Sequence, residues 1–133
     1  GDIVQISEII ASAAPGFGVF AGSGSYLLTT LVMGGVGATA ALANVLPDEC
    51  AAVVELFDAG RLDAARRMQQ ALLDINRAVT SRFNVPGLKA ALDLLGHCGG
   101  PPRMPMHTLD EANTAILKGI LDRAQAACAE VLS

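Results

Sequence analysis

The chain carries no charged side chain between residues 9 and 47, which raises a choice between a membrane segment and a buried core. Residues 27–46 have the length needed to cross a bilayer. However, this window contains three glycines and Asn44, and it lacks the flanking Lys and Arg residues that usually orient membrane helices. We therefore interpret the stretch as strand, helix and strand inside a parallel α/β protein, whose strands are apolar on both faces.

The N-terminal third divides into a helix, a strand, a second helix and a second strand. Isoleucines at helical spacing predict a helix over residues 2–14. A short apolar run at residues 17–21 is typical of a buried strand, and the glycine- and serine-rich residues after it suit a strand-to-helix loop. We expect a helix over residues 25–33 and a strand over residues 38–45. The small side chains of this second strand indicate that a ligand or another backbone lies close.

From Pro47 onward the pattern is helical. Pro47 suits the first position of a helix, with Asp48 and Glu49 in its first turn. An amphipathic stripe predicts a helix of about five turns from Leu62. The residues of this stripe are Ala65, Met68, Leu72, Ile75 and Val79.

Two further helices complete the predicted inventory. A shorter helix is expected over residues 87–95, followed by an irregular Gly- and Pro-rich connector over residues 99–105. Thr108 and Glu111 have the spacing of a capping box for the last helix. Its apolar face is expected to comprise Ala112, Ile116, Ile120, Ala127 and Val131. Two strands and about six helices cannot close a parallel sheet, so the sequence indicates one part of a larger α/β unit.

Composition excludes several function classes. The net charge is −4, so neither nucleic acid nor an anionic membrane is an expected partner. Cys50, Cys98 and Cys128 are odd in number and widely spaced, which favours buried or half-buried thiols in a reducing compartment over disulfides. We expect a cytoplasmic or mitochondrial protein.

Three motifs admit a functional interpretation beside a structural one. Gly35 to Ala40 fits the loose G-x-G-x-x-A pattern, but it coincides with a predicted strand, whereas a dinucleotide fingerprint follows a strand. The segment Gly22 to Ser25 could cradle an anion or form an ordinary tight turn. His97, Cys98 and His107 match no zinc spacing, so we predict loop histidines and neither a metal nor a cofactor.

The two lysines, Lys89 and Lys118, lie inside predicted helices. A Schiff-base lysine must be partly desolvated and directed into a pocket, usually from the end of a barrel strand. We therefore interpret both as solvated helix residues and expect no catalytic residue within the chain.

Several strings resemble the dihydrodipicolinate synthase and N-acetylneuraminate lyase superfamily, and within it the 4-hydroxy-2-oxoglutarate aldolase branch. The similarity extends in order over nearly the whole chain. The strings are Phe20–Leu28, Gly34–Ala38, Ala43–Pro47, Ala78–Phe83, Pro86–Lys89, Gly99–Pro101 and Arg103–Pro105.

The resemblance implies an α/β fold, namely the C-terminal part of a (β/α)₈ TIM barrel with about two strands, followed by a C-terminal helical bundle. Residues 1–47 would form strand–helix units six to eight, and residues 48–133 the final barrel helix and the appended helices. Such barrels are often tetrameric. The expected partners are therefore the missing N-terminal barrel half, further copies of the chain and a pyruvate or 2-oxo acid substrate.

The resemblance also implies a class I aldolase or lyase that acts on pyruvate-derived 2-oxo acids such as 4-hydroxy-2-oxoglutarate. Its Schiff-base lysine would lie just before Gly1, so this chain alone is expected to be inactive. Gly22, with Ser23 beside it, and Thr39 match positions that line the pyruvate pocket. The alternatives are a dihydrodipicolinate synthase-type condensation and a non-enzymatic assembly module.

Overall fold

The N-terminal part of the computed structural model, which describes residues 2–133, is a strand–helix–strand unit preceded by a helix. Its two short strands pair in parallel, with Phe20 opposite Gly37 and Ala21 opposite Ala38. A 3₁₀ turn and a helix connect them, as expected for a barrel unit. The elements are α1 (Ile3–Ser12), β1 (Phe20–Ala21), η1 (Gly24–Tyr26), α2 (Leu27–Val32) and β2 (Gly37–Ala38).

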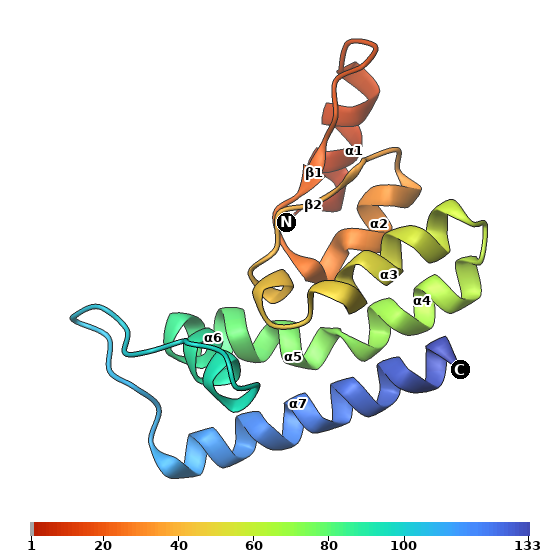
Figure 1. Cartoon of the computed structure of the whole chain (residues 1–133). Helices are drawn as coiled ribbons and strands as arrows, with labels where there is room; N and C mark the ends of the chain where they lie inside the picture. The colour runs from red at the N-terminus through yellow and green to blue at the C-terminus, as the bar shows by residue number, and fades with distance from the viewer. Residues whose placement is uncertain (1) are drawn as a thin grey trace.

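The remaining residues form helices that pack in layers below this unit (Figure 1). The long C-terminal helix α7 runs along the α4–α5 segment, on the side away from α3. The elements are η2 (Ala41–Asn44), α3 (Pro47–Asp58), α4 (Leu62–Ala71), α5 (Leu73–Arg77), the π-helical η3 (Ala78–Arg82), α6 (Asn84–Leu94) and α7 (Glu111–Leu132). The α/β class with two strands and a C-terminal helical bundle is as predicted.

The predicted amphipathic stripe forms the centre of the helical core. All five of its members are at most 2% exposed. The helix that carries them breaks at Leu72 and changes to π-helical geometry at η3, so one predicted helix becomes three consecutive segments. The spacing of apolar residues therefore predicted the buried core correctly. It could not predict where the helix is interrupted, because the apolar spacing continues through the interruptions.

Three local predictions are wrong. The strand expected over residues 38–45 ends at Ala38, and Ala41–Asn44 form a 3₁₀ turn instead. Half of residues 38–45 are alanine, which favours helical over extended backbone. The last helix is capped by Asp110, whose carboxylate accepts from the Asn113 N–H at 2.7 Å, so Thr108 forms no capping box.

The buried face of the last helix is also displaced from the predicted one. Ile116 is 43% exposed, whereas its neighbour Leu117 is fully buried. Of the predicted face, only Ile120 is buried. The residues of α7 that do face the core are Leu117, Ile120, Leu121, Ala124 and Cys128. Because Ile116 and Leu117 are adjacent and both apolar, the sequence fits either of two neighbouring faces of the helix as the buried one.

Four large apolar side chains in or next to the strands and α2 are uncovered: Phe17 before β1, Phe20 in β1, Val32 at the end of α2 and Val36 before β2. We call these four residues the open strand surface. These side chains are 67%, 58%, 55% and 53% exposed, respectively, and helix α1 beside them has no buried residue. Parallel strands are normally covered on both faces. No helix within residues 2–133 combines the length and the apolar character needed to cross a membrane.

The cysteines are only partly as predicted: Cys50 and Cys128 are buried, but Cys98 is exposed. Burial, with a smaller contribution from the charge of Glu49, raises the pKa of both buried thiols from 9.0 to about 11. Below pH 9 the thiols are protonated in the folded and the unfolded chain alike. Between pH 9 and 11 the unfolded chain loses these protons first, so these two thiols lower the free energy of unfolding as the pH rises.

We therefore expect urea unfolding curves to show this loss between pH 9 and 11. The Cys50→Ala, Cys128→Ala double variant is the control, because it keeps every other titrating group. The decline must be smaller in the double variant than in the parent. Equal declines in both would refute the assignment of the effect to these thiols.

Candidate functional site

The structure brings Gly22 and Thr39 together at the carboxyl end of the strand pair, which we call its edge below. Gly22 directly follows β1, Thr39 directly follows β2, and the Thr39 N–H donates to the Ala21 carbonyl oxygen at 2.8 Å. This bond extends the parallel pairing to the carboxyl ends of both strands. Gly22 and Thr39 are exposed. In barrels the carboxyl ends of the strands carry the active site, so this edge is the candidate site.

Ser23 follows Gly22 and is engaged by neighbouring residues through its hydroxyl group. Its hydroxyl oxygen accepts from the Ser25 N–H at 3.3 Å and from Asn76 Nδ2 at 3.2 Å. It therefore caps the 3₁₀ turn η1 and faces the helices. Tyr26 was not predicted, yet its hydroxyl lies 3.4 Å from the position that a Cβ on Gly22 would occupy. A polar group thus approaches the strand end from the turn.

The turn after β1 is held by side chains that sequence reasoning did not single out. Gln69 on α4 bonds to the backbone of Gly24 and Leu28, and Asn76 on α5 bonds to two serine hydroxyls. Because the N–H groups of Ser25 and Leu28 are already bonded to side-chain oxygens, the anion-cradle interpretation loses two of its donors. The sequence did offer one clue to these contacts: Gln69 and Asn76 are amide side chains on the helix face that carries the apolar stripe.

Each lysine contacts a residue on, or just after, its own helix. Lys118 is exposed and pairs with Asp122 at 2.7 Å, as expected of a solvated helix lysine. That interpretation is wrong for Lys89, which is half-buried and donates from Nζ to the Gly99 carbonyl oxygen. Lys89 thereby fastens the connector to α6.

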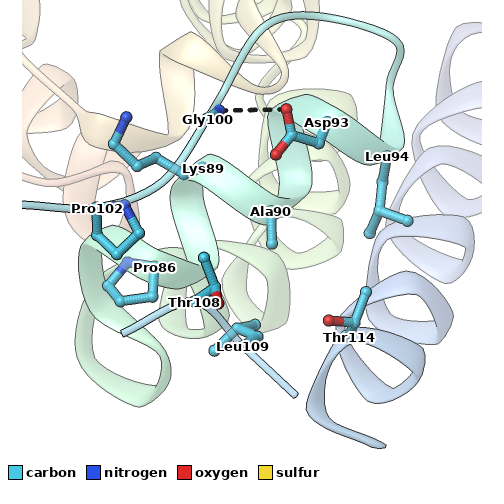
Figure 2. Close-up of a pocket in the computed structure, with 10 residues that line it drawn as sticks. All are labelled: Pro86, Lys89, Ala90, Asp93, Leu94, Gly100, Pro102, Thr108, Leu109 and Thr114. Carbon is cyan, nitrogen blue, oxygen red and sulfur yellow. Dashed lines mark hydrogen bonds between the residues drawn. The ribbon is translucent and has the colours of Figure 1, made fainter. Parts of the chain in front are cut away.

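A cavity of about 300 Å³ lies beside this anchor, between α6, the connector and the start of α7 (Figure 2). The Asp93 carboxylate borders it and accepts from the N–H groups of Gly99 and Gly100 at 2.8 and 3.3 Å. The residues around this cavity are Pro86, Lys89, Ala90, Asp93, Leu94, Gly100, Pro102, Thr108, Leu109 and Thr114. None of Gly22, Ser23 and Thr39 borders it, so it is separate from the candidate site.

The remaining motifs form no site among the described residues. His97, Cys98 and His107 are exposed, and residues 2–133 contain no cluster of three His, Cys, Asp or Glu side chains able to hold a metal. The segment from Gly35 to Ala40 contains β2 itself. It therefore lacks the strand–turn–helix order of a dinucleotide fingerprint.

Comparison with known proteins identifies relatives of this fold. The sequence profile of the Dihydrodipicolinate synthetase family matches residues 1–124. The chain is 37% identical over 121 residues to a 4-hydroxy-tetrahydrodipicolinate synthase of Caldicellulosiruptor bescii, covering 91% of this chain and 41% of that protein. It is 38% identical over 122 residues to the enzyme of that name from Methanoculleus marisnigri, covering 91% and 42%.

A solved structure agrees with these sequence relatives. The 4-hydroxy-tetrahydrodipicolinate synthase of Methylacidiphilum fumariolicum SolV superposes with a TM-score of 0.88 at 27% identity. The match covers 98% of this chain and 44% of that one. The chain thus spans about two fifths of the length of the relatives it matches. It belongs to the Dihydrodipicolinate synthetase family and corresponds to the C-terminal portion of that family's barrel.

Proposed function

We propose that this chain supplies part of the pocket wall of a Schiff-base barrel that condenses pyruvate with an aldehyde. The observation that carries the proposal is the parallel strand pair, which ends in Gly22 and Thr39 at one edge and leaves the open strand surface uncovered. An apolar surface of this kind on paired strands calls for further strands or helices to cover it. The missing N-terminal barrel half is the proposed partner.

The chemistry requires a nucleophilic amine that these residues do not provide. We infer that a lysine on a strand preceding Gly1 attacks the C2 carbonyl of pyruvate and forms an imine with loss of water. The protonated imine then accepts the electron pair left at C3 when a C3 proton is removed, and this carbon attacks the aldehyde. Hydrolysis of the imine releases the product and restores the lysine.

Gly22 and Thr39 would contribute backbone, and not acid, base or nucleophile, to this pocket. A residue without a side chain at position 22 allows substrate to approach the main chain closely. The Thr39 N–H is occupied by Ala21, so this amide cannot donate to substrate. The chain would therefore shape the pocket and exclude water.

The names of the relatives favour a dihydrodipicolinate synthase-type condensation over the cleavage of 4-hydroxy-2-oxoglutarate. The two sequence relatives described above and the superposed structure carry the name 4-hydroxy-tetrahydrodipicolinate synthase. None of the three is named as a 4-hydroxy-2-oxoglutarate aldolase. We therefore propose the synthase reaction for the full-length protein that contains this chain.

Steady-state assays with that full-length protein test the choice of reaction. We expect kcat/KM for the formation of 4-hydroxy-tetrahydrodipicolinate to exceed kcat/KM for the cleavage of 4-hydroxy-2-oxoglutarate by at least about tenfold, the lower range for discrimination between related substrates. The isolated chain, assayed in parallel, should catalyse neither reaction. A preference for the cleavage substrate would overturn the proposed reaction.

A further inference from the structure

We propose that Gln69 and Asn76 are positioning residues that hold the turn after β1, residues 22–28, in the geometry needed to bind pyruvate. The proposal rests on the proposed function for its substrate, but its structural basis is independent of it. Neither residue borders the strand edge itself. They act through the turn that begins at Gly22, which we call the β1 turn.

The Gln69 side chain forms hydrogen bonds with two backbone groups of the β1 turn. Its Oε1 accepts from the Leu28 N–H at 3.0 Å, and its Nε2 donates to the Gly24 carbonyl oxygen at 2.8 Å. One amide thus satisfies an acceptor in the first residue of η1 and a donor in the first turn of α2. The side chain is 8% exposed, so both bonds form away from solvent, where an unmade bond is costly.

Asn76 fixes the middle of the same turn. Its Nδ2 donates to the Ser25 hydroxyl at 2.6 Å and to the Ser23 hydroxyl at 3.2 Å, and the residue is 2% exposed. Gly24 packs directly on it, because a Cβ at this glycine would lie 3.0 Å from Asn76 Oδ1. The turn therefore has little room to shift toward the helices.

The two amides lie on consecutive helices, Gln69 on α4 and Asn76 on α5, with the break at Leu72 between them. Both amides are buried, as are Leu72 and Ile75 beside them. Apolar residues of similar size at these positions would avoid the cost of burying amides. Both polar atoms of the Gln69 amide and Nδ2 of Asn76 are bonded to the turn, whereas Asn76 Oδ1 is buried without a partner among the described residues. Buried hydrogen bonds to a loop define its geometry more narrowly than apolar packing does.

The geometry of the β1 turn bears directly on the candidate site. Gly22 is its first residue, and Tyr26, whose hydroxyl approaches Gly22, is part of it. If the turn loosens, the strand end and the tyrosine hydroxyl move together relative to bound substrate. A displacement near 1 Å can cost about 100-fold in rate, so support of this turn affects substrate handling without any contact to the reacting atoms.

The test compares Gln69→Leu with Gln70→Leu in the full-length protein. Gln70 is the exposed neighbour of Gln69 on the same helix, so it controls for the loss of an amide and for the gain of leucine. We expect Gln69→Leu to accelerate hydrogen exchange of the amides of residues 24–28 by roughly tenfold or more, with exchange in α7 unchanged. KM for pyruvate should rise by about tenfold, while Gln70→Leu matches the parent.

A double-mutant cycle covers the case in which Gln69→Leu fails to fold. Asn76→Ala and Ser25→Ala should each raise KM for pyruvate, and the double variant should raise it by less than the product of the two changes, because both remove one hydrogen bond. Ser81→Ala, an exposed serine on η3, should leave KM unchanged. Independent effects of Asn76→Ala and Ser25→Ala would overturn the role of their bond.

Two further results separate this proposal from the proposed function. Unchanged exchange over residues 24–28 in Gln69→Leu, or equal acceleration throughout the chain, would overturn the positioning role. If the parent protein forms no pyruvate imine, the proposed function fails. A local increase in exchange would then show that the two amides support the β1 turn but would refute their role in pyruvate binding.

Discussion

Gly35→Ala should destabilise the protein by roughly 1–3 kcal/mol or more and separate β1 from β2, because position 35 has no space for a methyl group. A Cβ there would lie 2.4 Å from Thr30 Cγ2 and 2.9 Å from the carbonyl oxygens of Thr30 and Val19. Val19 is the residue whose carbonyl accepts from the Val36 N–H at 2.9 Å. The clash therefore falls on the strand pairing that brings Gly22 and Thr39 together.

Gly119→Ala is the matched control for this prediction. Gly119 lies within α7, and a methyl group added there would have the flexible end of Arg123 as its nearest neighbour, at 3.5 Å. Alanine favours a helix over glycine by about 0.5–1 kcal/mol, so this variant should be as stable as the parent or more stable. Urea unfolding measures both changes. A Gly35→Ala variant as stable as Gly119→Ala would show that the packing around position 35 is wrongly described.

The sequence predicted the helical core well because periodic apolar residues report burial directly. The stripe from Ala65 to Val79 is buried as expected, and Gly96 ends α6 with a positive φ of 81°. The order of the two strands was predicted correctly, but β1 is shorter than expected and β2 overlaps the predicted second strand only at Ala38. Where several apolar residues are adjacent, as at Ile116 and Leu117, the sequence did not define the buried face.

The candidate site was predicted in part. The strand-end positions Gly22 and Thr39 do meet at one edge, since parallel strands place their carboxyl ends together. The contacts of Gln69 and Asn76 were not foreseeable, because they join residues more than 40 positions apart in the sequence. Lys89 was misjudged for a different reason: its partner Gly99 is only ten positions away, but it lies on a connector whose path over α6 has no periodic signal in the sequence.

The largest functional effect should come from a lysine outside this chain. Replacement of the nucleophile in a covalent mechanism lowers the rate by several orders of magnitude. Lys118 pairs with Asp122 and Lys89 bonds to Gly99, so neither amine is placed to substitute for it. Lys89→Arg and Lys118→Arg variants of the full-length protein should therefore still form the pyruvate imine, whereas replacement of the inferred lysine before Gly1 should abolish it.

Reductive trapping tests this most directly. The full-length protein is incubated with pyruvate and borohydride, digested, and the modified lysine is located by peptide mass spectrometry. We predict one adduct, on a lysine that precedes Gly1, with the peptides carrying Lys89 and Lys118 unmodified. An adduct on either of these two lysines would contradict the account, and the absence of any adduct would favour a non-enzymatic role for the barrel portion.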